Sequence, residues 1–252
     1  MWQKVKHTLL RTGQMVLLSG MIGGFAFGVM EYADAIDLFG LKRVLVSGTS
    51  LVSQEEVIAL AEVEPGTSLF AIPLDSVQKR VGANPFIKVA AASRQFPRTL
   101  CIQVHERTPL AYLNAGKLYS IDSTGYIMPM PAAGPQLGIP ILSGLTKMEE
   151  LQVNGPAEHD QVLQMVNILT DIRRTYPGLY PQISELVHTE RDNYVLFTTE
   201  GATRIMLGSQ QFTRKIHLLE AFWATVGTGR SWGDYEYIDL RFQKQVIVRE
   251  QT

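Results

Sequence analysis

Histidine and cysteine carry much of the metal binding and nucleophilic catalysis in proteins, and this sequence of 252 residues uses both sparingly. Its five histidines are scattered, and no two of them have the spacing that places a pair of metal ligands on one face of a helix. The single cysteine, Cys101, falls in the middle of an expected strand without an identifiable general base. A lone cysteine also excludes a disulfide within the chain. We therefore expect no metal site and no catalytic residue.

Two further patterns that often mark active sites lack the required context. Gly227, Gly229 and Gly233 follow an expected helix, whereas a phosphate-binding glycine loop needs a strand that leads into a helix. Adjacent acids such as Glu149 and Glu150 are usually solvated. Lysine and arginine number 23 against 24 acidic residues, so the overall charge does not favour nucleic acid as a partner. The sequence predicts a non-enzymatic protein with no cofactor and no small-molecule substrate, and an extracytoplasmic enzyme is the least favoured alternative.

The end of the sequence offers another kind of chemistry, that of unpaired backbone groups. Residues 237–242 alternate polar and apolar side chains, residues 243–245 follow, and an apolar run at 246–249 comes within three residues of the end. A strand at 246–249 at the edge of a sheet would present free N–H and C=O groups on its outer side, and such an edge can accept a strand from a partner. The alternative is a short, harmless edge that Arg249 and Glu250 protect by their charge.

The elements that must position this edge begin at residue 41. Alternating side chains at 43–47 predict a strand, and a capping box at Ser53 predicts the start of a helix. Asp75 is expected to cap a second helix. Two strands are then expected at 87–95 and 100–107, joined by a short turn. The predicted order is therefore strand, helix, helix, strand, strand.

From residue 110 the sequence predicts a second, mainly antiparallel β domain with helices, so the fold class is α+β. Apolar residues recur at helical spacing in two stretches, which predicts helices at 157–176 and 210–226. Alternating or apolar runs between and after these helices predict strands at 194–198, 203–207, 237–242 and 246–249.

The first thirty residues have the pattern of a membrane anchor. Basic residues precede an uncharged stretch at 12–30, and acids follow it. A stretch of this length can cross a bilayer as a helix, and the basic flank predicts a cytoplasmic N-terminus. Glycines recur every fourth residue within it, a spacing that allows two membrane helices to approach closely. Ala33 and Ala35 leave open a cleavable signal peptide instead.

Short motifs between residues 41 and 109 resemble those of a POTRA domain. They are Asn84-Pro85-Phe86-Ile87, Phe96-Pro97-Arg98-Thr99-Leu100 and Val104-His105-Glu106-Arg107-Thr108-Pro109. Together with a basic tail, one membrane helix and a second β-rich domain, they make the sequence resemble the FtsQ/DivIB family of bacterial cell-division proteins over nearly its whole length. The resemblance implies a cytoplasmic tail at 1–11, a transmembrane helix at 12–30, a POTRA domain at 41–109 and an FtsQ-type β domain at 110–252.

The resemblance also implies a function and a set of partners. A member of this family would be a single-pass type II protein of the inner (plasma) membrane at the division septum, with its bulk in the periplasm. It would act as a divisome scaffold, with membrane division proteins resembling FtsB and FtsL as partners. The alternative from another class is a POTRA-containing periplasmic or outer-membrane assembly or secretion component with a cleaved signal peptide.

In the family, a segment of FtsB adds as a strand to the final strand, which implies where partner-binding residues lie here. They are Arg191, Arg241, Phe242, Val246, Ile247, Val248 and Arg249. Arg241 would pair with an acid of the partner, and Arg191, at the start of a neighbouring strand, is a weaker candidate. The turn at 243–245 lacks the glycine that is common there in the family, so the register of the last hairpin is left open.

Overall fold

The computed structural model describes residues 38–131, 138–146, 151–242 and 245–251, together with residues 17, 19–25, 27–29 and 32. The chain divides into two compact units, Met1–Glu106 and Arg107–Thr252. The predicted cytoplasmic tail at 1–11 and parts of the predicted membrane helix lie outside the described residues. Within the described part, no helix combines the length and the hydropathy that crossing a membrane requires.

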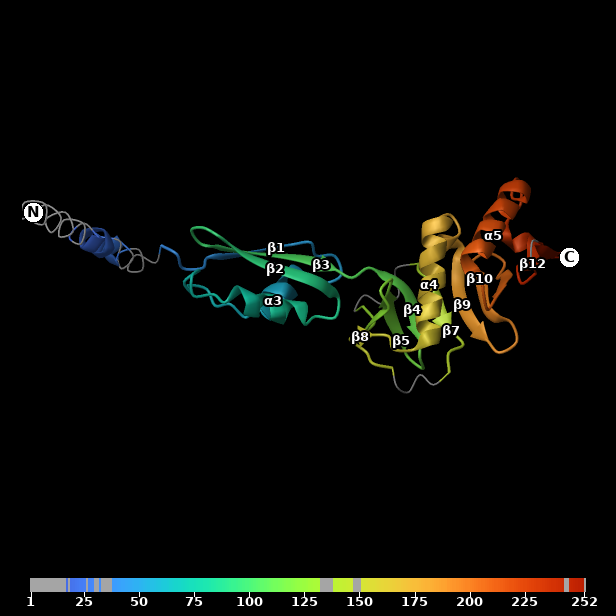
Figure 1. Ribbon diagram of the computed structural model, residues 1–252, viewed down its shortest axis with the longest axis horizontal. Coiled ribbons are helices and arrows are strands. Elements are labelled where there is room, and N and C mark those ends of the chain that lie inside the picture. Colours follow the sequence, from blue (N-terminus) through green and yellow to red (C-terminus); the bar gives the residue numbers. More distant parts are fainter. Residues whose placement is uncertain are drawn as a thin grey trace, which may run out of the picture. The chain divides into compact units, whose positions relative to one another are not determined.

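The first unit contains a three-stranded sheet in the order β1-β3-β2. Two helices pack against this sheet, and Figure 1 shows α3 beside it. The elements are β1 (Arg43–Ser47), α2 (Gln54–Ala61), α3 (Leu74–Gly82), β2 (Ile87–Gln95) and β3 (Thr99–Glu106). Strand β3 is parallel to β1 and antiparallel to β2. The predicted order of strand, helix, helix, strand, strand is confirmed.

The alternation along β3 decides which face of this sheet carries the core. Leu100, Ile102 and Val104 are buried against the helices, whereas Gln103 and His105 are exposed on the other face. Successive side chains of a strand point to opposite faces of the sheet, so every second residue, here the apolar ones at 100, 102 and 104, faces the core. The predicted burial of one face of this strand is therefore confirmed.

The two helix starts differ in how they are capped. The hydroxyl of Ser53 accepts a hydrogen bond from the backbone N–H of Glu56 at 3.1 Å, which confirms the hydroxyl half of the predicted capping box of α2. The Glu56 carboxylate accepts a hydrogen bond from the side chain of Asn84 at 2.8 Å. The predicted cap at Asp75 is wrong, because α3 already begins at Leu74, directly after Pro73, and no side chain caps it. Asp75 lies instead in the first turn, where a carboxylate interacts favourably with the positive end of the helix dipole.

A carboxylate within the motif at 104–109, for which the sequence predicted no contact, joins the end of β3 to the segment before α2. Glu106 accepts hydrogen bonds from three successive backbone N–H groups, those of Ser50 at 2.9 Å, Leu51 at 2.7 Å and Val52 at 2.9 Å. These groups precede the helix and would otherwise lack a partner within it. Glu106 therefore fixes the connection between β1 and α2.

Replacing Glu106 with glutamine is expected to destabilise the first unit by about 1–3 kcal/mol, because an uncharged amide has a single acceptor oxygen for three donors. Hydrogen exchange of the Ser50, Leu51 and Val52 amides should become faster. Glu64 is an exposed acid of the same unit, so Glu64→Gln is the matched control and should leave these amides unchanged. Unchanged protection in Glu106→Gln would show that the carboxylate does not hold this connection.

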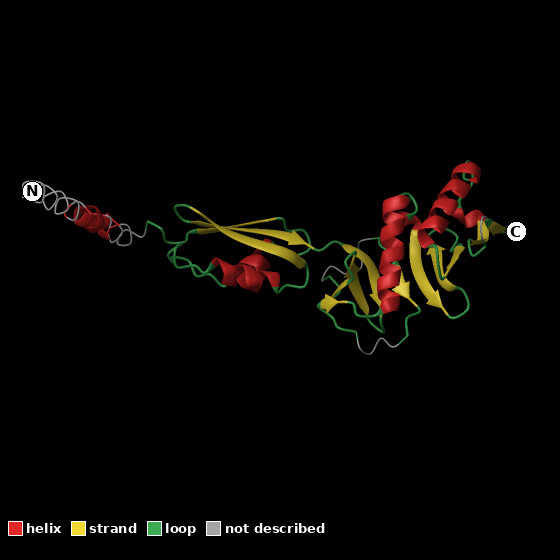
Figure 2. Cartoon of the chain, in the orientation of Figure 1, coloured by secondary structure: helices red, strands yellow, loops and turns green. Residues whose placement is uncertain are grey.

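The second unit contains a sheet of ten described strands in the order β13-β12-β11-β10-β9-β7-β4-β5-β6-β8. Its strands are β4 (Pro109–Asn114), β5 (Leu118–Asp122), β6 (Tyr126–Met128), β7 (Ile141–Ser143), β8 (Gly155–Pro156), β9 (Ile183–Thr189), β10 (Asn193–Thr198), β11 (Arg204–Gly208), β12 (Tyr235–Asp239) and β13 (Ile247–Glu250). Its helices are α4 (Asp160–Thr175), α5 (Phe212–Val226) and the short 3-10 turns η2 (Tyr180–Gln182) and η3 (Trp232–Asp234). Most neighbouring strands are antiparallel, as predicted, but β4–β7, β7–β9 and β11–β12 are parallel. Figure 2 shows the helices and strands of both units.

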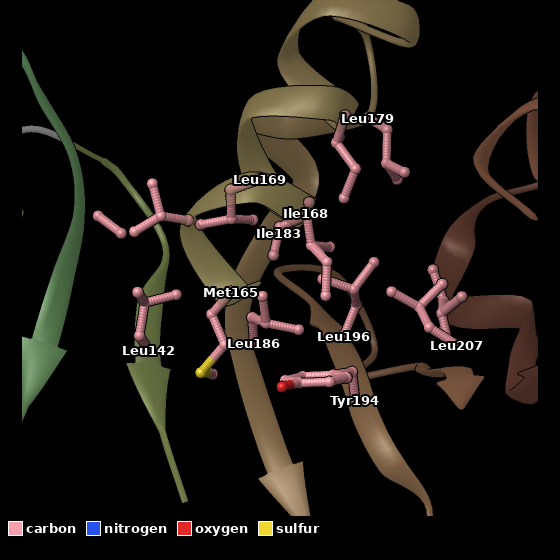
Figure 3. Close-up of a cluster of buried hydrophobic side chains, with 14 of the residues drawn as sticks. Leu142, Met165, Ile168, Leu169, Leu179, Ile183, Leu186, Tyr194, Leu196 and Leu207 are labelled. Carbon is pink, nitrogen blue, oxygen red and sulfur yellow. The ribbon is translucent and has the colours of Figure 1, made fainter. Parts of the chain in front are cut away.

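Helix α4 supplies one side of the core of this unit. Figure 3 shows Met165, Ile168 and Leu169 of α4 beside Leu186 and Leu196 of the sheet. All five side chains are fully buried, at 0% or 1% exposure. The helix begins at Asp160, three residues later than the predicted start at 157, and the residues at the predicted apolar spacing are buried.

The turn between β5 and β6 is built around a buried carboxylate. Asp122 accepts hydrogen bonds from the N–H and the hydroxyl of Thr124, at 2.8 and 2.5 Å, and from the N–H of Tyr126 at 3.0 Å. Arg107 donates to it at 2.9 Å and lies 3.5 Å from the centre of the Tyr126 ring. Burial alone would raise the pKa of Asp122, but the hydrogen bonds from Thr124, Tyr126 and Arg107 lower it below its usual range.

Candidate partner-binding site

The last described strand, β13, lies at one end of the larger sheet. It pairs antiparallel with β12, with Val248 opposite Ile238 and Ile247 opposite Asp239. Among the residues that the structure describes, no strand pairs with its outer side. The edge position expected from the sequence is confirmed, and the register of the hairpin is now defined.

One backbone hydrogen bond determines which backbone groups of β13 face outward. The N–H of Gln251 donates to the carbonyl oxygen of Asp234 at 2.8 Å, so residue 251 directs its backbone groups toward the preceding strand. Successive residues of a strand direct these groups to alternate sides. Ile247 and Arg249 therefore also face β12, whereas the N–H and C=O groups of Val248 and Glu250 point away from it. These outward groups can bond an added strand.

The two faces of β13 differ in their side chains. Val246 and Val248 are partly buried and pack against the core of the second unit. Ile247 lies on the opposite face and is 38% exposed, and Arg249 beside it forms an ion pair with Glu236 at 2.9 Å. An added strand would therefore meet an apolar side chain and a charged one on the outer face of the sheet.

The C-terminal end of β13 is fastened to the segment that follows α5. Glu250 forms an ion pair with Arg230 at 2.5 Å, and the guanidinium of Arg230 lies 5.6 Å from the centre of the Tyr235 ring. Next to Tyr235, the rings of Trp223 and Trp232 are stacked with centroids 3.7 Å apart. These contacts join the end of β13 to the segment around Tyr235.

Arg241 and Phe242 lie beyond the end of β12, not within it. The predicted strand at 237–242 is wrong at both ends, because β12 runs from Tyr235 to Asp239. Arg241 is engaged within the chain: its guanidinium donates to Asp239 at 2.6 and 2.9 Å and to Asp192 at 2.5 Å. Phe242 is 50% exposed. The role of Arg241 as a charge partner for another protein stays a prediction, and any such partner would share it with two internal acids.

Asp239 is the buried member of this group. Burial would raise the pKa of its carboxyl group, but hydrogen bonds from the side chain and backbone of Arg241 lower that pKa below its usual range. Lys215 lies close by and donates to the carbonyl oxygen of Leu207 at 2.5 Å. Burial lowers the pKa of Lys215, while Asp239 opposes this effect. These charges form one connected group at the start of the edge.

A cavity of about 400 Å³ opens beside this group. The N-terminal half of α5 contributes Arg214, Lys215 and Leu218, and the segment after β12 contributes Arg241 and Phe242. The cavity therefore combines positive charge with an exposed aromatic side chain next to the start of β13. In the described part of the chain, no group of histidine, cysteine, aspartate or glutamate is arranged to hold a metal ion.

Replacing Arg241 with glutamine is expected to destabilise the second unit by about 1–2 kcal/mol, because it removes the charged donor from a carboxylate that is only 6% exposed. Urea unfolding followed by the fluorescence of Trp223 and Trp232 measures this. Arg204→Gln is the matched control, since the pair of Arg204 with Glu236 is largely exposed and should contribute less than about 1 kcal/mol. Equal effects of the two substitutions would contradict a structural role for Arg241.

Two family models match the chain over consecutive ranges. Residues 39–107 match the FtsQ-type POTRA domain, and residues 108–248 match the FtsQ/DivIB C-terminal related domain. The second match alone covers more than half of the chain. The chain belongs to the FtsQ/DivIB family. The predicted family and the predicted POTRA domain are thereby confirmed.

Curated members of the FtsQ/DivIB family align with most of the chain. Cell division protein FtsQ of Geotalea daltonii is 26% identical over 246 residues, which cover 98% of this chain and 88% of that protein. FtsQ of Syntrophotalea carbinolica is 29% identical, covering 94% of this chain and 83% of that protein. FtsQ of Rhodothermus marinus is 31% identical, covering 84% and 78%. The chain is thus similar to cell-division proteins in both of its units.

The remaining site residue predicted from the FtsQ/DivIB resemblance, Arg191, is exposed and lies in the turn between β9 and β10. Its expected place at the start of a strand is wrong by two residues, because β10 begins at Asn193. The neighbouring Asp192, which bonds Arg241, was missed, as were Asp239 and Glu236. The contact of Asp192 with Arg241 joins segments 49 residues apart, whereas Asp239 lies two residues from Arg241 and Glu236 meets Arg249 across the last hairpin. Only the acids around residues 190 and 236 could have pointed to this group.

Proposed function

We propose that the chain is a non-enzymatic scaffold of the division machinery that holds a partner protein by strand addition to β13. The observation that supports this function is the outward direction of the backbone groups of Val248 and Glu250 at the end of the sheet. Main-chain bonds to such an edge supply affinity, and alternate side chains supply specificity. The ion pair of Glu250 with Arg230 restrains the end of β13 before a partner binds. Less conformational entropy is then lost on binding, which favours the complex.

The side chains around the edge define the chemistry of the partner segment. It would be extended, with an apolar residue over Ile247 and an acid near Arg249 or Arg191. A larger apolar residue would contact Phe242 beside the cavity. By family resemblance, the partners would be membrane division proteins similar to FtsB and FtsL. The proposed partner-binding set is Arg191, Arg241, Phe242, Val246, Ile247, Val248 and Arg249.

The proposed scaffold also requires an anchor. We place a cytoplasmic tail at 1–11, a transmembrane helix at 12–30, a POTRA domain at 41–109 and the partner-binding domain at 110–252. The uncharged stretch between basic and acidic flanks supports a type II orientation in the inner membrane. Mass spectrometry of the mature protein should find the N-terminal segment intact, whereas a chain that begins after Ala35 would favour the assembly or secretion component instead.

Site-specific cross-linking tests the edge directly. A photoreactive amino acid at position 247 should cross-link to an extended segment of a membrane division protein in cells. Leu118 of β5 is the matched control, because its 40% exposure is close to the 38% of Ile247. A label at 118 should give no such product. Cross-links at both positions, or at 118 alone, would refute strand addition at β13.

A further inference from the structure

Three phenylalanines form a surface cluster where the described chain enters the first unit; Phe39, Phe70 and Phe96 are called the aromatic patch. Ring centroids are 5.1 Å apart for Phe39 and Phe70, 5.3 Å for Phe70 and Phe96, and 6.1 Å for Phe39 and Phe96. Phe70 and Phe96 are 51% and 55% exposed. Large apolar side chains are usually covered, and a contiguous exposed group of them marks a contact surface.

The aromatic patch is held in place by the backbone. The N–H of Leu69 donates to the carbonyl oxygen of Phe39 at 2.9 Å, which joins the entering segment to the loop that carries Phe70. The guanidinium of Arg94 donates to the carbonyl oxygens of Leu69 and Ile72 at 2.5 and 2.7 Å, which joins that loop to the end of β2 before Phe96. The three rings therefore share one preformed surface and do not depend on a loose loop.

The sequence limits what this surface can meet. The uncharged stretch ends at residue 30, so eight residues, 31–38, separate it from Phe39. Eight residues span about 12 Å as a helix and at most about 29 Å when extended, and a headgroup layer is about 5–7 Å thick on each side of a bilayer. If the stretch crosses the membrane, the aromatic patch is tethered within reach of the lipid surface.

Positive side chains lie on the segments that carry the aromatic patch, while the acids Glu31, Asp34 and Asp37 belong to the connecting segment before it. Lys42 and Arg43 are exposed and lie three and four residues after Phe39. Arg94 donates to backbone carbonyl oxygens, which carry no net charge and so do not neutralise its guanidinium. Aromatic rings flanked by lysine and arginine favour the boundary between acyl chains and phosphate headgroups.

We propose that the aromatic patch inserts into the headgroup layer of the membrane and fixes the orientation of the first unit on the bilayer. This inference rests on the proposed membrane anchor. It assigns Phe70 and Phe96 a lipid contact, with Lys42 and Arg43 beside the phosphate groups. The first unit would then contact the membrane in two places, through the anchor and through the aromatic patch.

Electron paramagnetic resonance of the full chain in nanodiscs of phosphatidylethanolamine and phosphatidylglycerol tests this proposal. In a Cys101→Ser background, a nitroxide at position 71 reports on the aromatic patch without removing a ring. Val89, 52% exposed near the other end of β2, is the matched position. Collisions with a water-soluble nickel complex should be several-fold rarer at position 71 than at position 89. Adding Phe70→Ser and Phe96→Ser should abolish the difference.

A label at position 17 separates failure of this inference from failure of the anchor. Shielding at 17 with equal accessibility at 71 and 89 would overturn the lipid contact and leave the anchor standing. Free accessibility at 17 would overturn both. Shielding at 71 that vanishes when each nanodisc holds a single chain would assign the aromatic patch to a second copy and would also overturn the proposal.

Discussion

Proline in place of Val248 is expected to weaken partner binding about 10- to 100-fold, or roughly 1.4–2.8 kcal/mol, while the chain stays folded. The N–H of Val248 points away from β12, so its loss removes a donor from the outer edge and no bond from the sheet itself. Proline is tolerated on an edge strand when its missing N–H faces outward. Its ring would also obstruct an approaching strand.

The matched control is Val248→Ala, which removes a similar amount of packing but keeps the outward N–H. Affinity for the partner, measured with the full chain in nanodiscs, should stay close to that of the parent in the alanine variant. A second comparison is Arg249→Pro, whose N–H faces β12. This change should unfold the edge and lower the melting temperature. If alanine and proline at 248 weaken binding equally, the side chain, and not the backbone edge, holds the partner.

Replacing Asp122 with asparagine is expected to destabilise the second unit by about 3–5 kcal/mol, the largest effect on stability that we expect from one substitution. The side chains of Asp122 and Arg107 are only 5% and 14% exposed. Removing the charge of Asp122 leaves that of Arg107 without its partner in a place that water reaches poorly. Urea unfolding followed by the fluorescence of Trp223 and Trp232 gives the free energy.

A double variant separates this pair from simple loss of packing. Adding Arg107→Met to Asp122→Asn removes the uncompensated charge and should restore part of the stability. Glu200 is an exposed acid of the same unit, and Glu200→Gln should change the free energy of unfolding by less than about 0.5 kcal/mol. A double variant as unstable as the sum of the two single variants would show that the two charges do not interact.

The acid side of the stability profile depends on the same carboxylate. The folded-state pKa of Asp122 is lowered, so the stability that its ionised form contributes is fully present above its unfolded pKa, about 3.9, and is lost as the pH falls through the lower folded value. The parent should therefore lose stability below about pH 4 more steeply than Asp122→Asn. Equal slopes would contradict the lowered pKa.

The local features of the fold were readable from the sequence because their causes are local. The alternation along 100–104 predicted the buried face of β3, and the helical spacing around Met165 predicted α4. The capping hydroxyl of Ser53 lies three residues from its donor. The apolar run at 246–249 also predicted a strand in the place where β13 lies.

Features that join distant parts of the chain were not readable. Asp192 and Arg241 are 49 residues apart, and their bond depends on the turn after β9 meeting the segment after β12. The parallel pairing of β11 with β12 requires α5 to cross between them, which no pattern within either strand encodes. The role of Glu106 depends on the loop at 50–52, which is more than fifty residues away in the sequence and meets Glu106 only in the folded chain. The sequence therefore indicated where an edge would lie but not the charges around it.

The two ends of the larger sheet are not alike. At the end opposite β13, β8 consists of only two residues, and the second of them, Pro156, has no N–H to donate. Growth of a filament needs two complementary edges on each subunit, so that every copy both offers and receives a strand. In the described part of this chain, one edge is suited to pairing and the other is poorly suited. Pairing of β13 with β13 of a second copy would thus close into a dimer, because neither copy would have a second suitable edge left for a third.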